Sequence, residues 1–206
     1  MVQNIIRALA LLGLFGLGYD HISDDSREVI QPVQTTIAEV VIAEPEPVVI
    51  VPPKPDCECL RDFMVSTIGV KEKTGNNDGF WVEKYLSNVK MSKGNPWCAA
   101  YVRYGLDSCG IKSTITAWSP TAVNKSNTVW KQGWKKESQV GDVFTLYYVK
   151  LGRVGHTGYV ESAVNSVTVE TIEGNTNQQG SRNGNGVFRR KRALNSLHGI
   201  WRWENR

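Results

Sequence analysis

The spacing of apolar residues changes from helical to strand-like part-way along the chain. Three helices are predicted first, over residues 59–70, 79–89 and 96–109, the last closed by Gly110. The pair Ser119-Pro120 predicts a short fourth helix. Five strands are predicted after it, over residues 142–149, 156–163, 166–173, 186–194 and 199–203. Helices followed by strands predict an α+β domain in which N-terminal helices pack on an antiparallel sheet.

No folded domain is predicted before about residue 56. An apolar run of eleven residues occupies positions 8–18, or about fourteen counted from Ile5 across Arg7. This length is short for a transmembrane helix and suits the apolar region of an export signal. We predict a signal peptide or an uncleaved signal-anchor at residues 1–20, with residues 5–18 as the membrane tether if the segment is retained. The protein is then expected to be exported or membrane-tethered.

Proline is concentrated in the segment that follows. Residues 27–55 hold six of the eight prolines, with Val, Ile and Glu between them. This composition predicts an extended spacer, and we assign residues 21–57 to a linker. Residues 58–206 remain for the folded domain, which is long enough to form one core.

Charge divides the chain at nearly the same place. Residues 1–55 carry three Lys or Arg against seven Asp or Glu, a net of −4, whereas residues 56–206 carry 21 against 13, a net of +8. A basic domain suggests a polyanionic partner, which could be nucleic acid, a membrane surface or a cell wall. The export segment argues against nucleic acid. The run Arg189-Arg190-Lys191-Arg192 is expected to be a solvated basic strand with two side chains on each face.

A thiol lies at a predicted helix start. In Asn95-Pro96-Trp97-Cys98, Asn95 is a good N-cap and Pro96 suits the first helical position, which places Cys98 third. Free backbone N–H groups and the positive end of the helix dipole favour thiolate over thiol there. A lone cysteine is more often a small buried hydrophobe, so a catalytic assignment depends on its partners.

The candidate partners are a histidine and two polar residues at a strand end. His156 opens a predicted strand beside a glycine-rich turn, and Glu173 and Asn175 end the next strand. Because Glu173 and Asn175 are two residues apart, they are expected to share one face of an extended chain and to reach the same imidazole. A thiolate, an imidazole and an orienting group form the arrangement of papain-like hydrolases. The sequence therefore predicts Cys98 as nucleophile and His156 as base.

These residues lie in blocks that resemble a known family, the CHAP domain (cysteine, histidine-dependent amidohydrolase/peptidase) of bacterial and phage cell-wall hydrolases. The likeness covers about residues 60–206. It rests on Asn95-Pro96-Trp97-Cys98-Ala99-Ala100-Tyr101-Val102, Gly155-His156-Thr157-Gly158-Tyr159-Val160, Glu173-Gly174-Asn175-Thr176 and the strand start Gly141-Asp142-Val143. The resemblance implies a papain-like CHAP fold, with Glu173 preferred as the residue that orients His156 and Asn175 as a further polar site residue.

The resemblance also implies the substrate. Similar domains cleave amide bonds in peptidoglycan, so an N-acetylmuramoyl-L-alanine amidase and a peptidoglycan endopeptidase are both open. The basic domain suits a wall rich in carboxylates and phosphates. We expect Trp97 and Trp118 to face the site, and we expect no metal and no cofactor. The alternative is a non-catalytic wall-binding or structural protein of an envelope or virion that keeps the fold.

Three further cysteines remain. Cys57 and Cys59 are separated by one residue, which does not suit a mutual disulfide. A bridge from Cys57 or Cys59 to Cys109, or between two chains, is open in an oxidising compartment.

Overall fold

The first described helix begins earlier than the sequence predicts. The computed structural model describes residues 56–204 except 133, 136–137 and 164–166, so the predicted signal segment and nearly all of the predicted linker lie outside the described residues. Helix α1 (Asp56–Thr67) includes the last two residues assigned to the linker. Acidic residues in its first turn favour this earlier start, and Gly69, with a φ of 89°, prevents the helix from reaching residue 70.

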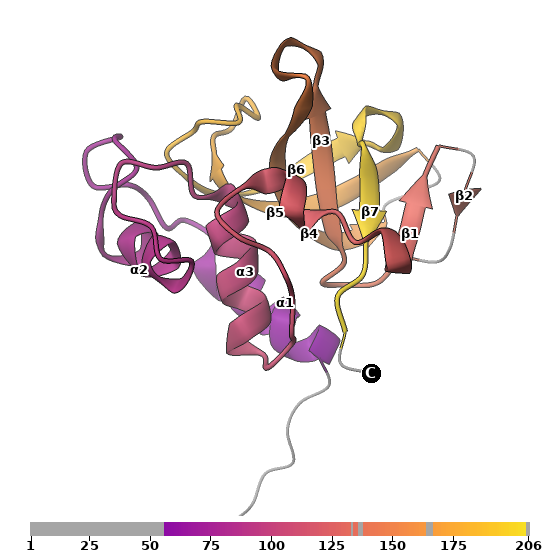
Figure 1. Ribbon diagram of the computed structural model, residues 1–206, viewed down its shortest axis with the longest axis horizontal. Helices are drawn as coiled ribbons and strands as arrows, with labels where there is room; N and C mark the ends of the chain where they lie inside the picture. The colour runs from indigo at the N-terminus through magenta and orange to yellow at the C-terminus, as the bar shows by residue number, and fades with distance from the viewer. Residues whose placement is uncertain (1–55, 133, 136–137, 164–166, 205–206) are drawn as a thin grey trace, which may run out of the picture. The chain divides into compact units, whose positions relative to one another are not determined.

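The other helices lie close to their predicted positions. They are α2 (Phe80–Asn88) and α3 (Cys98–Ser108), and Gly110 follows α3 with a left-handed φ of 72°. Ser119-Pro120 begins a single 3₁₀ turn, η1 (Ser119–Ala122). Helix α3 contacts both other helices and two strands, β4 (Arg153–Ala163) and β5 (Thr168–Thr176), and Figure 1 shows the helices together beside the sheet.

Within the described residues, seven antiparallel strands form one sheet in the order β2-β1-β7-β3-β4-β5-β6. Five correspond to the predicted strands, with ends shifted by a few residues: β3 (Val143–Tyr148), β4 (Arg153–Ala163), β5 (Thr168–Thr176), β6 (Gly186–Ala193) and β7 (Gly199–Trp201). Two further strands, β1 (Thr128–Lys131) and β2 (Trp134–Lys135), are not predicted by the sequence, because they are too short for an alternating pattern to emerge. Further 3₁₀ turns are η2 (Lys125–Asn127), η3 (Val149–Leu151) and η4 (Leu194–Ser196).

Two apolar clusters flank the sheet. The larger lies between the helices and the sheet and includes Leu106 of α3, Val143 of β3 and Tyr159 of β4. The smaller includes Phe144 and Val160, the neighbours of those strand residues, because successive strand side chains point to opposite faces. The fold is therefore α+β with helices on one face of an antiparallel sheet, as the sequence predicts.

One disulfide ties the helices together. Cys59 of α1 bonds to Cys109, which follows α3, and Cys57 is an exposed free thiol. This bond is one of the alternatives left open by the sequence. Among the described residues, no helix is long and apolar enough to span a bilayer.

Candidate active site

Cys98 occupies the first position of α3 and is 2% exposed. The sequence predicts the third position for Cys98, with Asn95 as the N-cap. The Asn95 side chain instead donates to the Ser92 carbonyl oxygen at 3.0 Å, and Trp97 is the N-cap residue. The thiol still lies in the first helical turn, where backbone N–H groups have no intrahelical acceptor.

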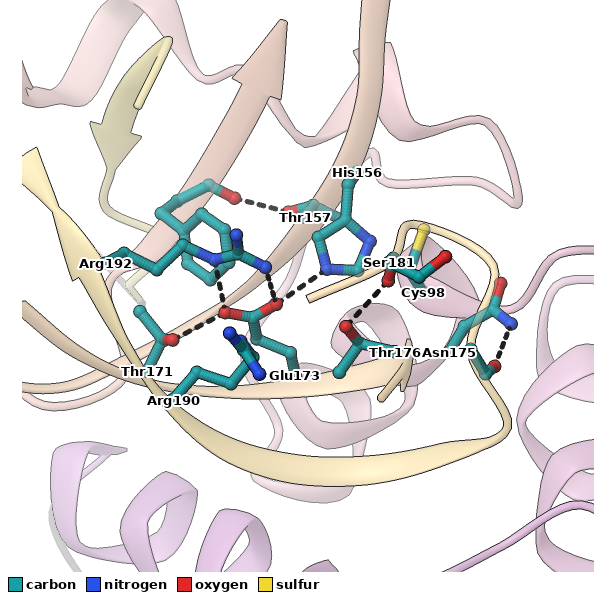
Figure 2. Close-up of polar contacts among 12 residues, drawn as sticks. Cys98, His156, Thr157, Thr171, Glu173, Asn175, Thr176, Ser181, Arg190 and Arg192 are labelled. Carbon is teal, nitrogen blue, oxygen red and sulfur yellow. Dashed lines mark hydrogen bonds and ion pairs between the residues drawn. The ribbon is translucent and has the colours of Figure 1, made fainter. Parts of the chain in front are cut away.

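A buried ion pair lies next to the thiol. His156 is in the middle of β4 rather than at its start, and its Nε2 lies 2.9 Å from Oε2 of Glu173 on β5. Both side chains are fully buried. Figure 2 shows the other ring nitrogen, Nδ1, on the side that faces Cys98, and Nδ1 accepts or donates no other hydrogen bond within the described residues. The geometry leaves Nδ1 available to exchange a proton with the thiol.

A hydroxyl group completes the surroundings of the sulfur. Oγ of Ser119, in η1, lies 3.4 Å from Cys98 Sγ, and the serine is buried. A thiolate accepts hydrogen bonds but donates none, so Ser119 would donate to Cys98 in its ionised form. The short helix predicted at Ser119-Pro120 therefore delivers a donor to the thiol, a contact that its sequence alone does not indicate.

Electrostatic interactions within the cluster favour its charged forms. Burial alone would raise the pKa of the Cys98 thiol, but His156, the Ser119 hydroxyl and the Thr157 backbone N–H together hold it below its ordinary value. Burial also opposes protonation of His156, yet Cys98 and Glu173 raise the imidazole pKa to about 9. Burial raises the carboxyl pKa of Glu173, but Arg192 and His156 outweigh it and lower that pKa to about 2.

A glycine makes room for the ion pair. Gly158 lies two residues beyond His156 on β4, and a Cβ at this position would come within 3.0 Å of Glu173 Cγ and within 2.8 Å of the Phe144 ring. Real Cβ atoms rarely pack so closely against their neighbours. A larger residue here would displace the carboxylate from the imidazole, which explains the second glycine of Gly155-His156-Thr157-Gly158.

Asn175 does not contact the imidazole, contrary to the prediction. The pairing of β5 with β6 shifts register between Glu173 and Thr176, and Asn175 adopts a φ of 57°, so it no longer shares a face with Glu173. Its Oδ1 accepts from the Trp97 backbone N–H at 3.1 Å, and its Nδ2 donates to Asn77 Oδ1 at 3.0 Å and to the Gly184 carbonyl oxygen at 2.9 Å. The Asn175 side chain therefore holds the backbone immediately before Cys98.

The two tryptophans expected at the site have different surroundings. Trp97 does not face the site, because its indole is fully buried against Tyr85 and Tyr101 and its Nε1 donates to Glu72 Oε1 at 2.8 Å. Trp118, immediately before Ser119, is 57% exposed. It is therefore available on the surface beside η1.

Glu173 has two further partners, Thr171 and Arg192, that the sequence does not predict. Thr171 donates to Oε1 at 2.6 Å, and Arg192 donates from Nε to Oε1 at 2.7 Å and from Nη2 to Oε2 at 2.5 Å (Figure 2). Arg192 was expected to belong to a solvated strand. The alternation of β6 holds for its neighbours, because Arg189 and Lys191 are exposed on the opposite face. The sequence does show that the basic run lies on a strand that follows Glu173. It does not show the register in which that strand pairs with β5, so it could not indicate which side chain of the run reaches the carboxylate.

Comparison with known families agrees with this geometry. Residues 90–175 match the family model described as CHAP domain. The chain contains a CHAP domain. The matched span includes Cys98, His156 and Glu173, and it ends before Arg192. No curated protein matches the chain.

CHAP domains belong to a family of peptidoglycan hydrolases and amidases. The match confirms the resemblance to CHAP domains that the sequence motifs show, together with the papain-like fold that it implies. Within the described residues, no group of three or more His, Cys, Asp or Glu side chains could hold a metal ion.

Proposed function

We propose that this protein hydrolyses an amide bond of peptidoglycan with Cys98 as the nucleophile. The observation that carries the proposal is the buried cluster of Cys98, His156 and Glu173, in which the thiol pKa is lowered and the imidazole pKa is raised. These directions favour a thiolate and an imidazolium before substrate arrives. Such a pair supplies both the nucleophile and the acid that amide cleavage requires.

The reaction proceeds in two steps. The Cys98 thiolate bonds to the amide carbonyl carbon, the C–N bond breaks, and His156 gives its proton to the leaving nitrogen. Water then attacks the resulting thioester, His156 accepts a proton from that water, and release of the carboxylic acid product restores the thiolate. Glu173 holds the imidazole through the Nε2 contact, so that Nδ1 keeps facing the sulfur.

The helix start supplies stabilisation for the negative oxygen that forms on the substrate. The backbone N–H groups in the first turn of α3, beginning with Cys98 itself, have no acceptor within the helix. A donor aimed at the developing oxyanion is worth several kcal/mol of barrier, on the order of 3. The substrate carbonyl is therefore expected to lie over the N-terminus of α3.

The proposal extends to where the protein acts. The apolar segment at residues 5–18 supports export, with or without retention as a membrane tether, and the +8 charge of residues 56–206 suits an anionic wall. Either the bond between sugar and stem peptide or one within the peptide fits the mechanism.

The proposal is tested on purified peptidoglycan by measuring new free amino groups over time. We expect the full-length protein to release new amino groups and its Cys98→Ala variant to release none. Cys57→Ser, which changes the exposed free thiol, is the matched control and should keep the wild-type rate. Release by Cys98→Ala at the wild-type rate would rule out the thiol mechanism. Wall binding without release by any of the three would favour a non-catalytic protein.

A further inference from the structure

The guanidinium of Arg192 binds the carboxylate of Glu173, which in turn contacts His156. Its Nε and Nη2 each donate to a different oxygen of Glu173, at 2.7 and 2.5 Å. The Arg192 side chain is 13% exposed and Glu173 is fully buried. A bidentate contact of this kind fixes the plane of the carboxylate as well as its position, which a lysine ammonium cannot do.

The strand pairing brings Arg192 to this point. Strand β6 lies beside β5 at the edge of the sheet, and its alternation turns Arg190 and Arg192 toward the site face while Arg189 and Lys191 point to solvent. The Arg192 guanidinium also lies 5.9 Å from the ring centroid of Phe144 on β3. The sheet therefore holds the side chain on two sides, and water does not replace it easily.

Glu173 accepts four hydrogen bonds, two at each oxygen. Oε1 accepts from Thr171 and from Arg192 Nε, and Oε2 accepts from His156 Nε2 and from Arg192 Nη2. Without the guanidinium, Oε2 would be free to turn away from the imidazole. Burial would also favour the neutral carboxyl, because it opposes the charge, and the hydrogen bonds from Arg192 are the largest single contribution that counters it.

We propose that Arg192 is a positioning residue of this active site, which locks Glu173 as an ionised, fixed partner of His156. The proposal rests on the proposed roles of Cys98, His156 and Glu173. Arg192 touches none of the reacting atoms and acts through the carboxylate. Its position beyond the matched residues 90–175 means that the match to the family does not assign it.

Other charged groups near the carboxylate come from three elements. His156 faces Glu173 from β4, the Cys98 thiolate lies beyond the imidazole on α3, and Tyr148 on β3 is close enough to interact with Glu173, Cys98 and Arg192. Burial raises the phenol pKa of Tyr148, so it stays neutral in the acid range. Arg192 is thus the permanent cation beside Glu173, because the imidazole of His156 can lose its proton whereas a guanidinium does not.

The test measures how fast iodoacetamide alkylates Cys98 as a function of pH, in the full chain with Cys57→Ser as background. This measurement reports the thiolate fraction and needs no substrate. In Arg192→Met we expect the acid limb to move to higher pH by about one unit or more, because Glu173 protonates earlier and ceases to support the imidazolium. In Arg192→Lys the charge remains, so the limb should stay near the wild-type position.

Turnover on peptidoglycan separates the two contributions of Arg192, which are its positive charge and its ability to fix the position of the Glu173 carboxylate. Both variants should lower kcat by about 10- to 100-fold with KM nearly unchanged, since Lys cannot hold the carboxylate plane. Arg189→Met is the matched control, because Arg189 makes the same two-pronged contact with Glu161 on the exposed face, at 2.6 Å for each bond. It should leave both measurements unchanged.

The alkylation and turnover measurements can each support or overturn the role of Arg192. A wild-type alkylation profile in Arg192→Met would overturn the proposal, as would wild-type kcat in Arg192→Lys if the Met variant does not fold. If the alkylation profile shifts as expected while the parent protein releases nothing from peptidoglycan, the role of Arg192 stands and the proposed function fails.

Discussion

The charge state of Cys98 is set by its partners more than by its burial. A buried thiol would ordinarily stay protonated, but His156 reverses that preference, and Glu173, which Arg192 helps to keep ionised, in turn stabilises the imidazolium. In the proposed mechanism the active form is the ion pair. The pH range in which this ion pair exists ends on the acid side where Cys98 becomes protonated and on the basic side where His156 loses its proton.

This balance predicts the pH dependence of hydrolysis. Because the pKa of His156 is raised to about 9, the imidazolium persists through neutral pH and is lost as the pH rises through that value. The thiol pKa is lowered, so the thiolate persists below its ordinary range. We expect a bell-shaped rate profile with its basic limb near pH 9, measured on purified peptidoglycan. A basic limb near 6.5, the ordinary histidine value, would contradict this electrostatic account.

The two polar residues at the end of β5 should respond differently to substitution. Glu173→Gln removes the charge that holds the imidazolium and leaves Arg192 without its counter-ion, so we expect the rate to fall by roughly 10²-fold or more. Asn175→Ala removes three hydrogen bonds behind the nucleophile and places Ala at a φ of 57°, so its main effect should be on stability, about 1–3 kcal/mol.

Steady-state rates and thermal unfolding of both variants test this division. Glu161→Gln, on the exposed face, serves as control for loss of a carboxylate paired with arginine. A larger rate loss in Asn175→Ala than in Glu173→Gln would exchange the two roles.

Sequence patterns predicted the elements better than the contacts between them. Cys98, His156 and Glu173 could be proposed together from the sequence because each lies in a motif with an element start or end beside it. Asn175 was placed on the wrong face because a register shift in β5 cannot be read from alternation. Arg192 was missed because its role depends on pairing between β5 and β6. Trp97 was misplaced because a residue before a helix can turn its side chain into the core.

The covalent link between α1 and the end of α3 predicts a dependence on oxidation state. The Cys59–Cys109 disulfide closes a loop with a sequence separation of 50, and such a bond typically stabilises by about 2–4 kcal/mol. We expect Cys109→Ser to lower the thermal transition while Cys98 keeps its reactivity at temperatures well below that transition. Calorimetry of the variant, with Cys57→Ser as control, tests this. An unchanged transition would show that the bond does not constrain the unfolded chain.

Across the chain, composition and charge separate a leader from the domain that carries the site. The Pro-rich segment at residues 27–55, about 30 residues long, can span up to roughly 90 Å if fully extended at about 3.1 Å per residue. We predict that full-length protein is found in the membrane or envelope fraction, and that deletion of residues 1–25 leaves a soluble protein that still cuts purified wall. Full-length protein found wholly in the cytosol with an intact amino terminus would remove the export proposal and leave the enzymatic one standing.

Mass spectrometry of peptidoglycan digested in water enriched in ¹⁸O tests the central claim most directly. Thiol-dependent hydrolysis predicts fragments with one new amine and one new carboxylate that carries a single heavy oxygen, because water resolves the thioester. A free amine on the stem peptide's first residue identifies an amidase, and one further along identifies an endopeptidase. The same fragments from Cys98→Ala, or wild-type fragments cut at glycosidic bonds instead, would contradict the account.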